Sequence, residues 1–230
     1  MDGTELRYLS IAAATCKIPT FEQLAIWEAL HSRKCPDALR DHIAGRLAAS
    51  HALEHSARLG QSKHVAIFND SQGAPHFQNH AELLSIAHRE GLGLAAVSAH
   101  VISGIDIETW DAFDSIPLCS WGYEERYFAQ MSEYQKKPQA KIKCAVWTST
   151  EALAKSLGTG LVARAGTLKV AELNIRPWGW QASFKHYPAA TAYVWPCHQY
   201  LVGLVIHQFK LNNPARIGNK LNTLLCAAVE

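Results

Sequence analysis

The sequence lacks the long apolar segment that a membrane-spanning helix requires. It contains no run of about 18 apolar residues, so we expect no transmembrane helix. The first ten residues, MDGTELRYLS, carry acidic residues early and no positively charged segment followed by an apolar one. We therefore expect no signal peptide.

Paired cysteines are also missing. The chain has six cysteines, and none of them shows Cys-x-x-Cys spacing. This pattern argues against a zinc site and favours reduced thiols. Together with the missing signal peptide, it predicts a cytoplasmic protein.

An excess of charge of one sign is absent as well. Lys and Arg number 22 and Asp and Glu number 20, which leaves a formal net charge of +2. This balance gives no argument for a nucleic-acid or membrane surface, and we expect neither partner. A chain of 230 residues with 48% hydrophobic and 18% charged residues is typical of one large globular domain or two small lobes.

Two carboxylates stand close together in the stretch Gly104–Glu108, which reads Gly-Ile-Asp-Ile-Glu. The alternation predicts the end of a buried strand, with Ile105 and Ile107 on one side and Asp106 and Glu108 on the other. Two carboxylates on one side repel each other unless a cation or solvent lies between them. The stretch is therefore either an Mg²⁺ site, since this ion favours carboxylate and phosphate oxygens, or a solvated strand end with two unpaired acids.

The first half of the chain predicts helices followed by strands. Residues 19–60 have helical patterns in two segments, the second starting at Pro36. A strand at Val65–Phe68 and a turn at Asp70–Pro75 follow. The apolar runs Leu83–Ala87 and Leu94–Val97 then predict a hairpin around Arg89-Glu90-Gly91.

The second half repeats this order. After a polar and aromatic connection, Trp110–Lys137, we expect a helix over Pro138–Leu157 and then four strands, followed by a loop and a short helix in Leu211–Glu230. Helix then strands, twice over, suggests two α+β lobes of similar build. The expected strands are Leu168–Leu173, Gln181–Lys185, Ala192–Trp195 and Tyr200–Ile206.

A third acid lies in the segment Trp147–Lys155, where Glu151 and Lys155 are one helical turn apart. Gly-Ile-Asp-Ile-Glu followed by Trp-x-x-x-Glu-Ala-x-x-Lys resembles the 4′-phosphopantetheinyl transferase family, in its two-lobed type first known from surfactin biosynthesis. Weaker family landmarks occur in the same order, so that the likeness covers roughly residues 40 to 160. These landmarks are Ala44–Leu47, Gly73–Pro75 and Ser85–His88.

The resemblance implies an α+β fold of two similar lobes related by a pseudo-twofold axis. Each lobe would hold a small antiparallel sheet with a long helix packed on it, and the active site would lie in the cleft between them. On this basis we expect an N-terminal lobe over 1–103 and a C-terminal lobe over 104–230.

The resemblance also implies an activity. The family transfers 4′-phosphopantetheine from coenzyme A to a serine of an apo acyl or peptidyl carrier protein and releases 3′,5′-ADP. The expected ion is Mg²⁺, with Mn²⁺ as a substitute, and coenzyme A is the substrate. The partner would be a carrier protein of fatty-acid, polyketide or nonribosomal peptide biosynthesis, and we expect a monomer.

By the same resemblance Asp106, Glu108 and Glu151 are the metal ligands. Either Glu151 or a water on the metal accepts the proton of the serine, and Lys155 contacts a phosphate oxygen. The alternative for the last two residues is an exposed Glu-Lys pair worth only about 0.3–0.5 kcal/mol. We expect the cleft to bring the three acids around one point, with His88 and Lys155 on the same wall.

For coenzyme A the resemblance implies contacts from Arg33, Arg46, His88 and Lys155. Each of the first three also has a plain structural interpretation: Arg33 is part of a surface basic pair, Arg46 is solvated on its helix, and His88 is a hydrogen-bonded residue at a strand end. Trp147 is interpreted as core packing for its helix.

Four positions depart from the family pattern. Ala74 stands in place of a Lys or Arg, Ala87 in place of a Ser, Arg89 in place of a small polar residue, and Thr150 in place of a Lys. They motivate an alternative function: a repurposed member of the family that binds a carrier protein, or processes a carrier-bound or small-molecule intermediate, without transferring phosphopantetheine.

Overall fold

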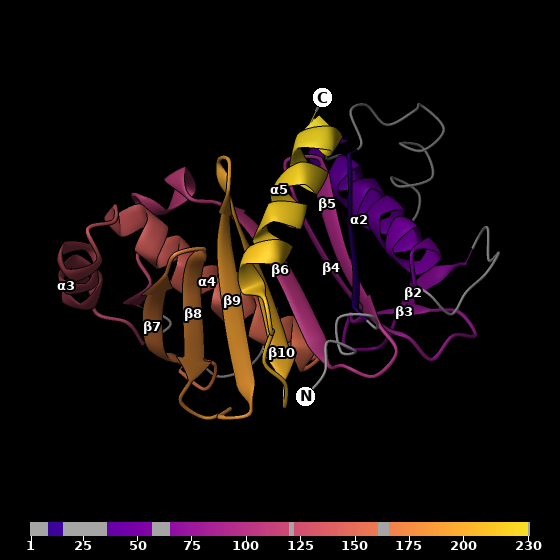
Figure 1. The fold of residues 1–230 in the computed structure, drawn as a ribbon. Coiled ribbons are helices and arrows are strands. Elements are labelled where there is room, and N and C mark those ends of the chain that lie inside the picture. The colour runs from indigo at the N-terminus through magenta and orange to yellow at the C-terminus, as the bar shows by residue number, and fades with distance from the viewer. Residues whose placement is uncertain (1–8, 16–35, 57–64, 120–121, 161–165, 230) are drawn as a thin grey trace.

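The computed structural model describes residues 9–15, 36–56, 65–119, 122–160 and 166–229. Over these residues the protein is an α+β structure of four α-helices and three antiparallel sheets (Figure 1). The predicted α+β class is confirmed. Arg33 and the helix expected before Pro36 lie outside the described residues.

A three-stranded sheet forms in the first half of the chain, in the order β1-β5-β4. Its strands are β1 (Leu9–Thr15), β4 (Leu83–Arg89) and β5 (Leu92–Ser98). Glu90 and Gly91 connect β4 to β5 with φ angles of 55° and 79°, which is the backbone of a two-residue hairpin turn. The predicted hairpin is therefore confirmed, whereas β1 was not predicted.

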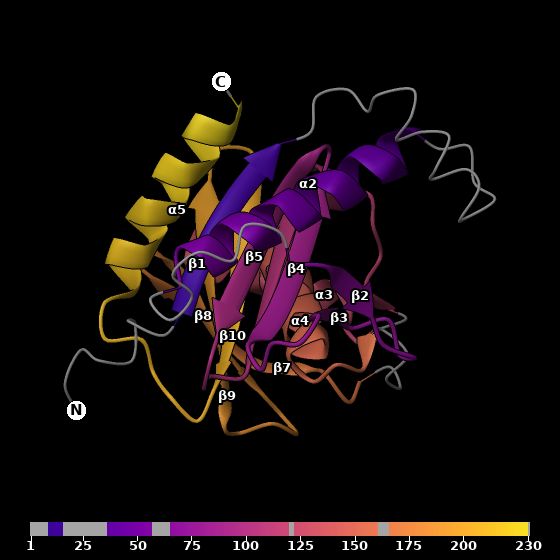
Figure 2. The same cartoon turned by 90° about the vertical axis from the view of Figure 1, so that its right-hand side faces the viewer.

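Helix α2 (Pro36–Glu54) crosses one face of this sheet (Figure 2). Its contact face consists of small residues, with Ala44, Ala48 and Ala52 fully buried. The helix lies so close to β5 that a Cβ at Gly93 would overlap the backbone of Ala44. Close packing between this helix and this sheet thus depends on a glycine in the strand.

A small ribbon of two strands lies beside this unit. Strand β2 (Ile67–Asn69) pairs with β3 (Pro75–Phe77). The turn between them includes Gly73 at a φ of 87° and is held by Asp70, whose carboxylate accepts the N–H of Ala74 at 2.9 Å. The predicted turn at Asp70–Pro75 is confirmed.

A five-stranded sheet forms in the second half, in the order β6-β10-β9-β8-β7 (Figure 1). Helix α4 (Gln139–Ser156) packs on β6 and β10, and α3 (Glu125–Gln135) packs on α4. The strands are β6 (Ser103–Thr109), β7 (Val170–Arg176), β8 (Gly179–Phe184), β9 (Ala190–Cys197) and β10 (Tyr200–His207). The four late strands and the long helix were predicted, but α3 was not.

Strand β6 has the predicted alternation. Ile105 and Ile107 are 0% and 1% exposed and enter the apolar core between the two large sheets. Asp106 and Glu108 therefore point to the opposite face of the strand, where α4 lies.

Helix α5 (Pro214–Val229) completes this core. Ile217, Leu221 and Leu225 recur every fourth residue and are buried against residues of both large sheets. The helix contacts β1 and β9 alike. A short helix without an assigned role was expected in Leu211–Glu230; it is in fact 16 residues long and covers the core.

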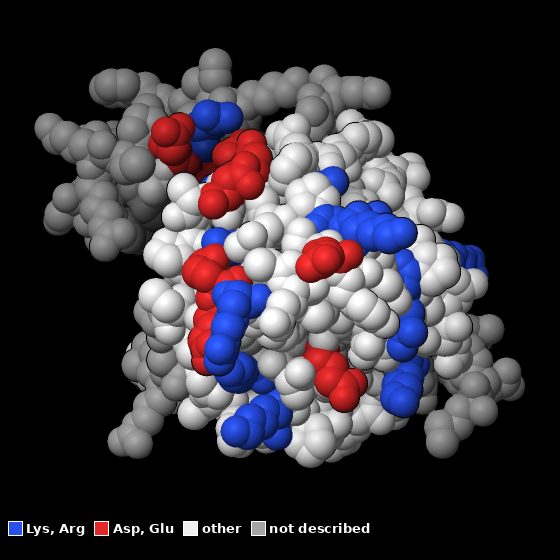
Figure 3. Space-filling model, turned by 90° about the vertical axis from the view of Figure 1, so that its left-hand side faces the viewer, with Lys and Arg blue, Asp and Glu red and all other residues white. Residues whose placement is uncertain are grey.

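Among the described residues no helix combines the length and apolar character needed to cross a membrane. On the face with α3 and β7, Lys and Arg occur together with Asp and Glu, separated by wide uncharged areas (Figure 3).

Candidate metal centre

Three carboxylates converge where helix α4 crosses strand β6. Asp106 and Glu108 come from β6 and Glu151 from α4, and each offers one oxygen such that these atoms all lie within 4.8 Å of one another. This is the convergence that the sequence motifs predict. We call these three residues the acidic triad.

Two glycines allow α4 to reach the triad. A Cβ at Gly104 would overlap the carbonyl oxygen of Ala152, and a Cβ at Gly203 on β10 would lie 2.6 Å from a methyl carbon of Thr148. The backbone of α4 therefore rests almost directly on β6 and β10. From this position the helix brings Glu151 and Lys155, one turn apart, to the carboxylates of β6.

Lys155 binds the most buried acid. Its Nζ donates to Oδ1 of Asp106 at 2.6 Å, and Asp106 is only 2% exposed. The other carboxylate oxygen, Oδ2, is buried without a hydrogen-bond partner. Because buried polar atoms are nearly always paired, this oxygen is a candidate ligand atom for a group that the chain itself does not supply.

The triad raises the pKa of two of its members. Burial, together with the nearby charge of Asp106, raises the pKa of Glu108 to about 7 and that of Glu151 to about 8. Burial alone would lower the pKa of Lys155, but the attraction of Asp106 and the two glutamates outweighs it and raises that pKa. The centre therefore has a strong affinity for positive charge, either as protons or as a cation.

Glu108 has two further neighbours. Arg89 Nη1 lies 3.3 Å from Glu108 Oε2, and the side chain of Trp147 hydrogen-bonds to the same carboxylate. Trp147 also packs against Phe113 at the edge of the core. It thus packs as predicted and also contacts the acidic triad.

The triad suits a hard divalent ion. Its donor set is three carboxylates, and oxygens around Mg²⁺ lie about 2.1 Å from the ion, hence at most about 4.2 Å apart. A small contraction of side chains within 4.8 Å of one another meets this geometry. The unpartnered Oδ2 of Asp106 is the natural first ligand.

Two cavities flank the triad. The first has a volume of about 250 Å³. Lys155 is the only charged side chain among its described lining residues, which are Gln72, Gly73, Ala74, Pro75, Leu84, Ser85, Ile86, Lys155, Gly158 and Gly160. The second cavity lies on the Glu108 side and is lined by Arg89, Glu108, Ala112, Phe113, Ile116 and Trp147.

The structure does not bring His88 to the acids. On β4 it belongs to the face toward α2, where its Nδ1 lies 3.6 Å from the carboxylate of Asp41. The α2 glycine Gly45 is its neighbour on that face. His88 and Lys155 therefore do not stand beside each other, in contrast to the single cleft wall expected from the sequence.

Arg46 lies on α2 and points to the ribbon of β2 and β3. It contacts the ring of His42 at 3.0 Å and donates to Asn69 Oδ1 at 3.3 Å. Arg33 lies outside the described residues. Of the four residues expected at coenzyme A, Lys155 therefore lies at the acidic triad. His88 and Arg46 lie around α2.

The departures from the family pattern occupy different environments. Thr150 is 3% exposed and hydrogen-bonds to Val146 O at 2.9 Å and to Tyr123, away from the acids. Ala87 is buried in the core between the sheets. Ala74 lines the first cavity, and only Arg89 contacts the acidic triad.

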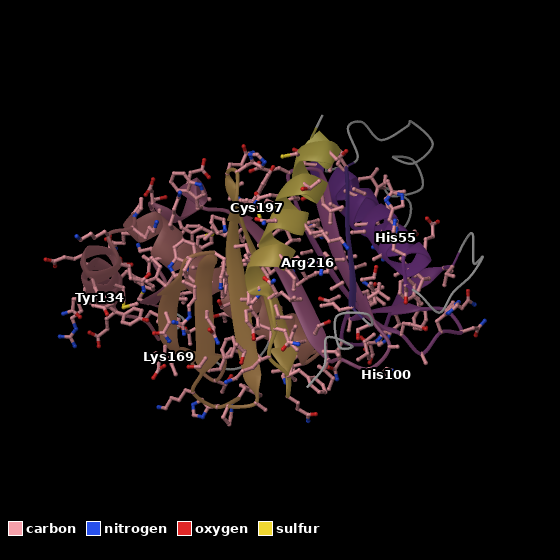
Figure 4. The ribbon with its side chains drawn as sticks, viewed as in Figure 1. His55, His100, Tyr134, Lys169, Cys197 and Arg216 are labelled. Atoms are coloured by element: carbon pink, nitrogen blue, oxygen red, sulfur yellow. The ribbon has the colours of Figure 1, made fainter. Side chains whose placement is uncertain are left out.

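Sequence reasoning missed the contacts made by Arg89 and by Ser85, whose Oγ accepts the N–H of Ile105 at 3.0 Å and ties β4 to β6. A signal for both exists: residues 85, 87 and 89 alternate onto one face of β4. His51 and His55 are both exposed; His51 lies in the last turn of α2, and His55 directly follows the helix (Figure 4).

Comparison of the sequence with models of protein families gives no match, and comparison with curated proteins gives none. The function proposed below therefore rests on the resemblance of the two motifs given above and on the geometry of their residues.

Proposed function

We propose that this chain is an Mg²⁺-dependent 4′-phosphopantetheinyl transferase of two similar lobes, 1–103 and 104–230, acting in the cytoplasm as a monomer. The observation that carries the proposal is the convergence of Asp106, Glu108 and Glu151 from two motifs more than forty residues apart, with Lys155 bonded to Asp106. Convergence of acids and a lysine on one point is what the resemblance requires.

The reaction is a phosphoryl transfer. The serine oxygen of an apo carrier protein forms a bond to the phosphorus that carries the pantetheine, and the bond from that phosphorus to 3′,5′-ADP breaks. Mg²⁺ held by the acidic triad would neutralise charge on the phosphate oxygens. The serine proton would pass to Glu151 or to a water on the metal.

The first cavity is the proposed site of the pyrophosphate end of coenzyme A. It connects the turn at Gly73–Pro75 and strand β4 with the end of α4, and Lys155 lies on its wall. A lysine there would contact a phosphate oxygen. His88 and Arg46 are proposed to contact the nucleotide on the α2 side, and Arg33 likewise.

The test is mass spectrometry of several apo carrier proteins incubated with coenzyme A, Mg²⁺ and this protein. The expected result is a gain of one phosphopantetheine on the carrier serine, dependent on Mg²⁺. Absence of a mass gain on every carrier would count against transfer.

A second candidate function is favoured by Ala74. With an alanine there, the first cavity has a single described cation, Lys155, and that cation is engaged by Asp106. A repurposed protein that binds a carrier protein or a carrier-bound intermediate would have this property. Calorimetry separates the two: binding of coenzyme A that needs Mg²⁺ supports transfer, while carrier binding without coenzyme A binding supports the second candidate.

A further inference from the structure

Arg89 is delivered to the acidic triad by the geometry of the β4–β5 hairpin. It is the last residue of β4 and directly precedes the turn residues Glu90 and Gly91. Ser85 and Ala87 alternate with it onto the face toward β6, where Ser85 bonds to Ile105. The turn itself is held by α2, because Asp41 accepts the N–H of Gly91 at 2.5 Å.

The guanidinium of Arg89 is bound at the triad but is incompletely satisfied. Besides the contact of Nη1 with Glu108 at 3.3 Å, Nη2 donates to Thr109 Oγ1 at 3.2 Å. Its Nε is buried, makes no hydrogen bond and lies 3.7 Å from the carboxylate of Glu90. An arginine with one donor unmet can leave this position at a smaller loss than a fully bonded one.

The triad therefore has two cations of its own on two different acids. Lys155 neutralises Asp106 and Arg89 neutralises Glu108. Lys155 bonds to Oδ1 of Asp106 and leaves Oδ2 without a hydrogen-bond partner. A metal ion at Oδ2 would therefore not need to displace Lys155. Arg89, in contrast, lies against Glu108 itself.

We infer that Arg89 is a tethered cation that competes with divalent metal for Glu108 and thereby sets the metal affinity of the acidic triad. Metal that takes all three carboxylates must displace the guanidinium from Glu108. The side chain has room to move, because it is 36% exposed and lines the second cavity. This inference rests on the proposed metal site and adds the regulation of its occupancy.

Manganese binding to the whole chain, without coenzyme A, tests the inference. Electron paramagnetic resonance of free Mn²⁺ gives the dissociation constant for the wild type and for the variants Arg89→Ser and Arg89→Lys. Arg89→Ser removes the competing charge, so we expect Mn²⁺ to bind at least about tenfold more tightly, in line with one unit charge at about 4 Å in a partly buried site. Arg89→Lys keeps the charge and should bind like the wild type.

Arg176→Ser is the matched control. Arg176 is exposed on β7 and donates to Gln181. The variant therefore has the same change of net charge four strands away from β6 and should bind Mn²⁺ like the wild type. A melting temperature that rises more with Mn²⁺ in Arg89→Ser than in the wild type gives a second readout.

The outcomes distinguish this inference from the metal site itself. If Arg89→Ser binds Mn²⁺ no more tightly than the wild type while Asp106→Asn loses binding, the metal site stands and the role of Arg89 is overturned. If Asp106→Asn binds Mn²⁺ as well as the wild type, both the inference and the metal site fail. They also fail if neither the wild type nor any variant binds Mn²⁺.

Discussion

Two helices pack closely on strands at glycine residues, and the acidic residues near these two contacts have different environments. Helix α2 rests on β5 where Gly93 meets Ala44, and helix α4 rests on β6 where Gly104 meets Ala152. Each crossing brings an acid on the helix close to side chains of a sheet. We refer to these as the α2 crossing and the α4 crossing.

At the α2 crossing the acid is satisfied. Asp41 accepts the N–H of Gly91 and contacts His88. Burial would raise its pKa, but these bonds outweigh burial and lower it. At the α4 crossing the pKa of Glu151 is raised and Asp106 has an unpartnered oxygen. Similar packing thus leaves the acid fully bonded at the α2 crossing, whereas the acids at the α4 crossing keep an oxygen that can bind a ligand.

The largest expected effect comes from Asp106→Asn, which removes the most buried charge of the triad while keeping the shape of the side chain. Turnover of a carrier protein should fall by more than about a hundredfold, because the metal ligand is lost. Stability without metal should change little, since repulsion among the acids falls as the bond to Lys155 weakens. Carrier mass spectrometry and thermal melts with and without Mg²⁺ measure the two effects. A large loss of stability with near-normal turnover would show that Asp106 is structural.

Gly104→Ala should disturb the α4 crossing as a whole. A Cβ there overlaps the backbone of Ala152, so α4 must move away from β6 at a cost of about 1–3 kcal/mol, and Mn²⁺ binding should weaken because Glu151 moves with the helix. Gly93→Ala is the matched variant at the α2 crossing. It should cost a similar amount of stability and leave Mn²⁺ binding intact. Equal loss of Mn²⁺ binding in both variants would contradict a difference between the crossings.

Asp41→Ala sharpens the comparison from the other side. It leaves the N–H of Gly91 and the ring of His88 without their partner, which should lower the free energy of unfolding by about 1–2 kcal/mol. Denaturant titration measures this loss. Turnover per folded molecule should fall far less than in Asp106→Asn.

The two crossings should also differ in the sign of their pH dependence. The pKa values of Glu108 and Glu151 rise from 4.5 to about 7 and about 8 on folding, so the folded state holds protons that the unfolded state releases. Their contribution to stability is full below about pH 4.5 and is lost as the pH rises toward 8. Asp41, whose pKa is lowered, contributes stability above about pH 4 that is lost on acidification.

Melts from pH 5 to 9 check this sign. Glu151→Gln should flatten the decline, and Mg²⁺ should offset it, because the ion favours the ionised acids. A decline that is unchanged in Glu151→Gln would exclude this residue as its source.

Local patterns made much of the α4 crossing predictable. Alternation in Gly104–Glu108 and the one-turn spacing of Glu151 and Lys155 are periodic signals, and both are confirmed. The side of β4 on which His88 lies was not predicted correctly. Alternation along the strand links it to Arg89, because residue 88 must face α2 once residue 89 faces β6. Nothing in the local pattern says which face meets which helix, because that depends on tertiary packing.

Other elements gave weak signals. Strand β1 is rich in alanine, which has little preference for strands. Helix α3 has the sequence ERYFAQMSEYQ, in which only Phe128 and Gln135 are buried. The helix therefore lacks the repeated apolar positions that indicate a helix in a sequence. Gln135 joins Trp180 Nε1 at 2.8 Å and the carbonyl of Leu173 at 2.9 Å, which are contacts between segments far apart in the chain.

The position of β6 has a consequence for the order of folding. Its partner in the sheet is β10, paired from Ser103 with Ile206 to Thr109 with Tyr200, so about a hundred residues of chain must close into a loop before this pair forms. Helix α5 joins β1 across a still longer loop. Contacts of such range slow folding. The acidic triad is therefore expected to assemble late, after the β4–β5 hairpin and helix α4, whose contacts are local, have already formed.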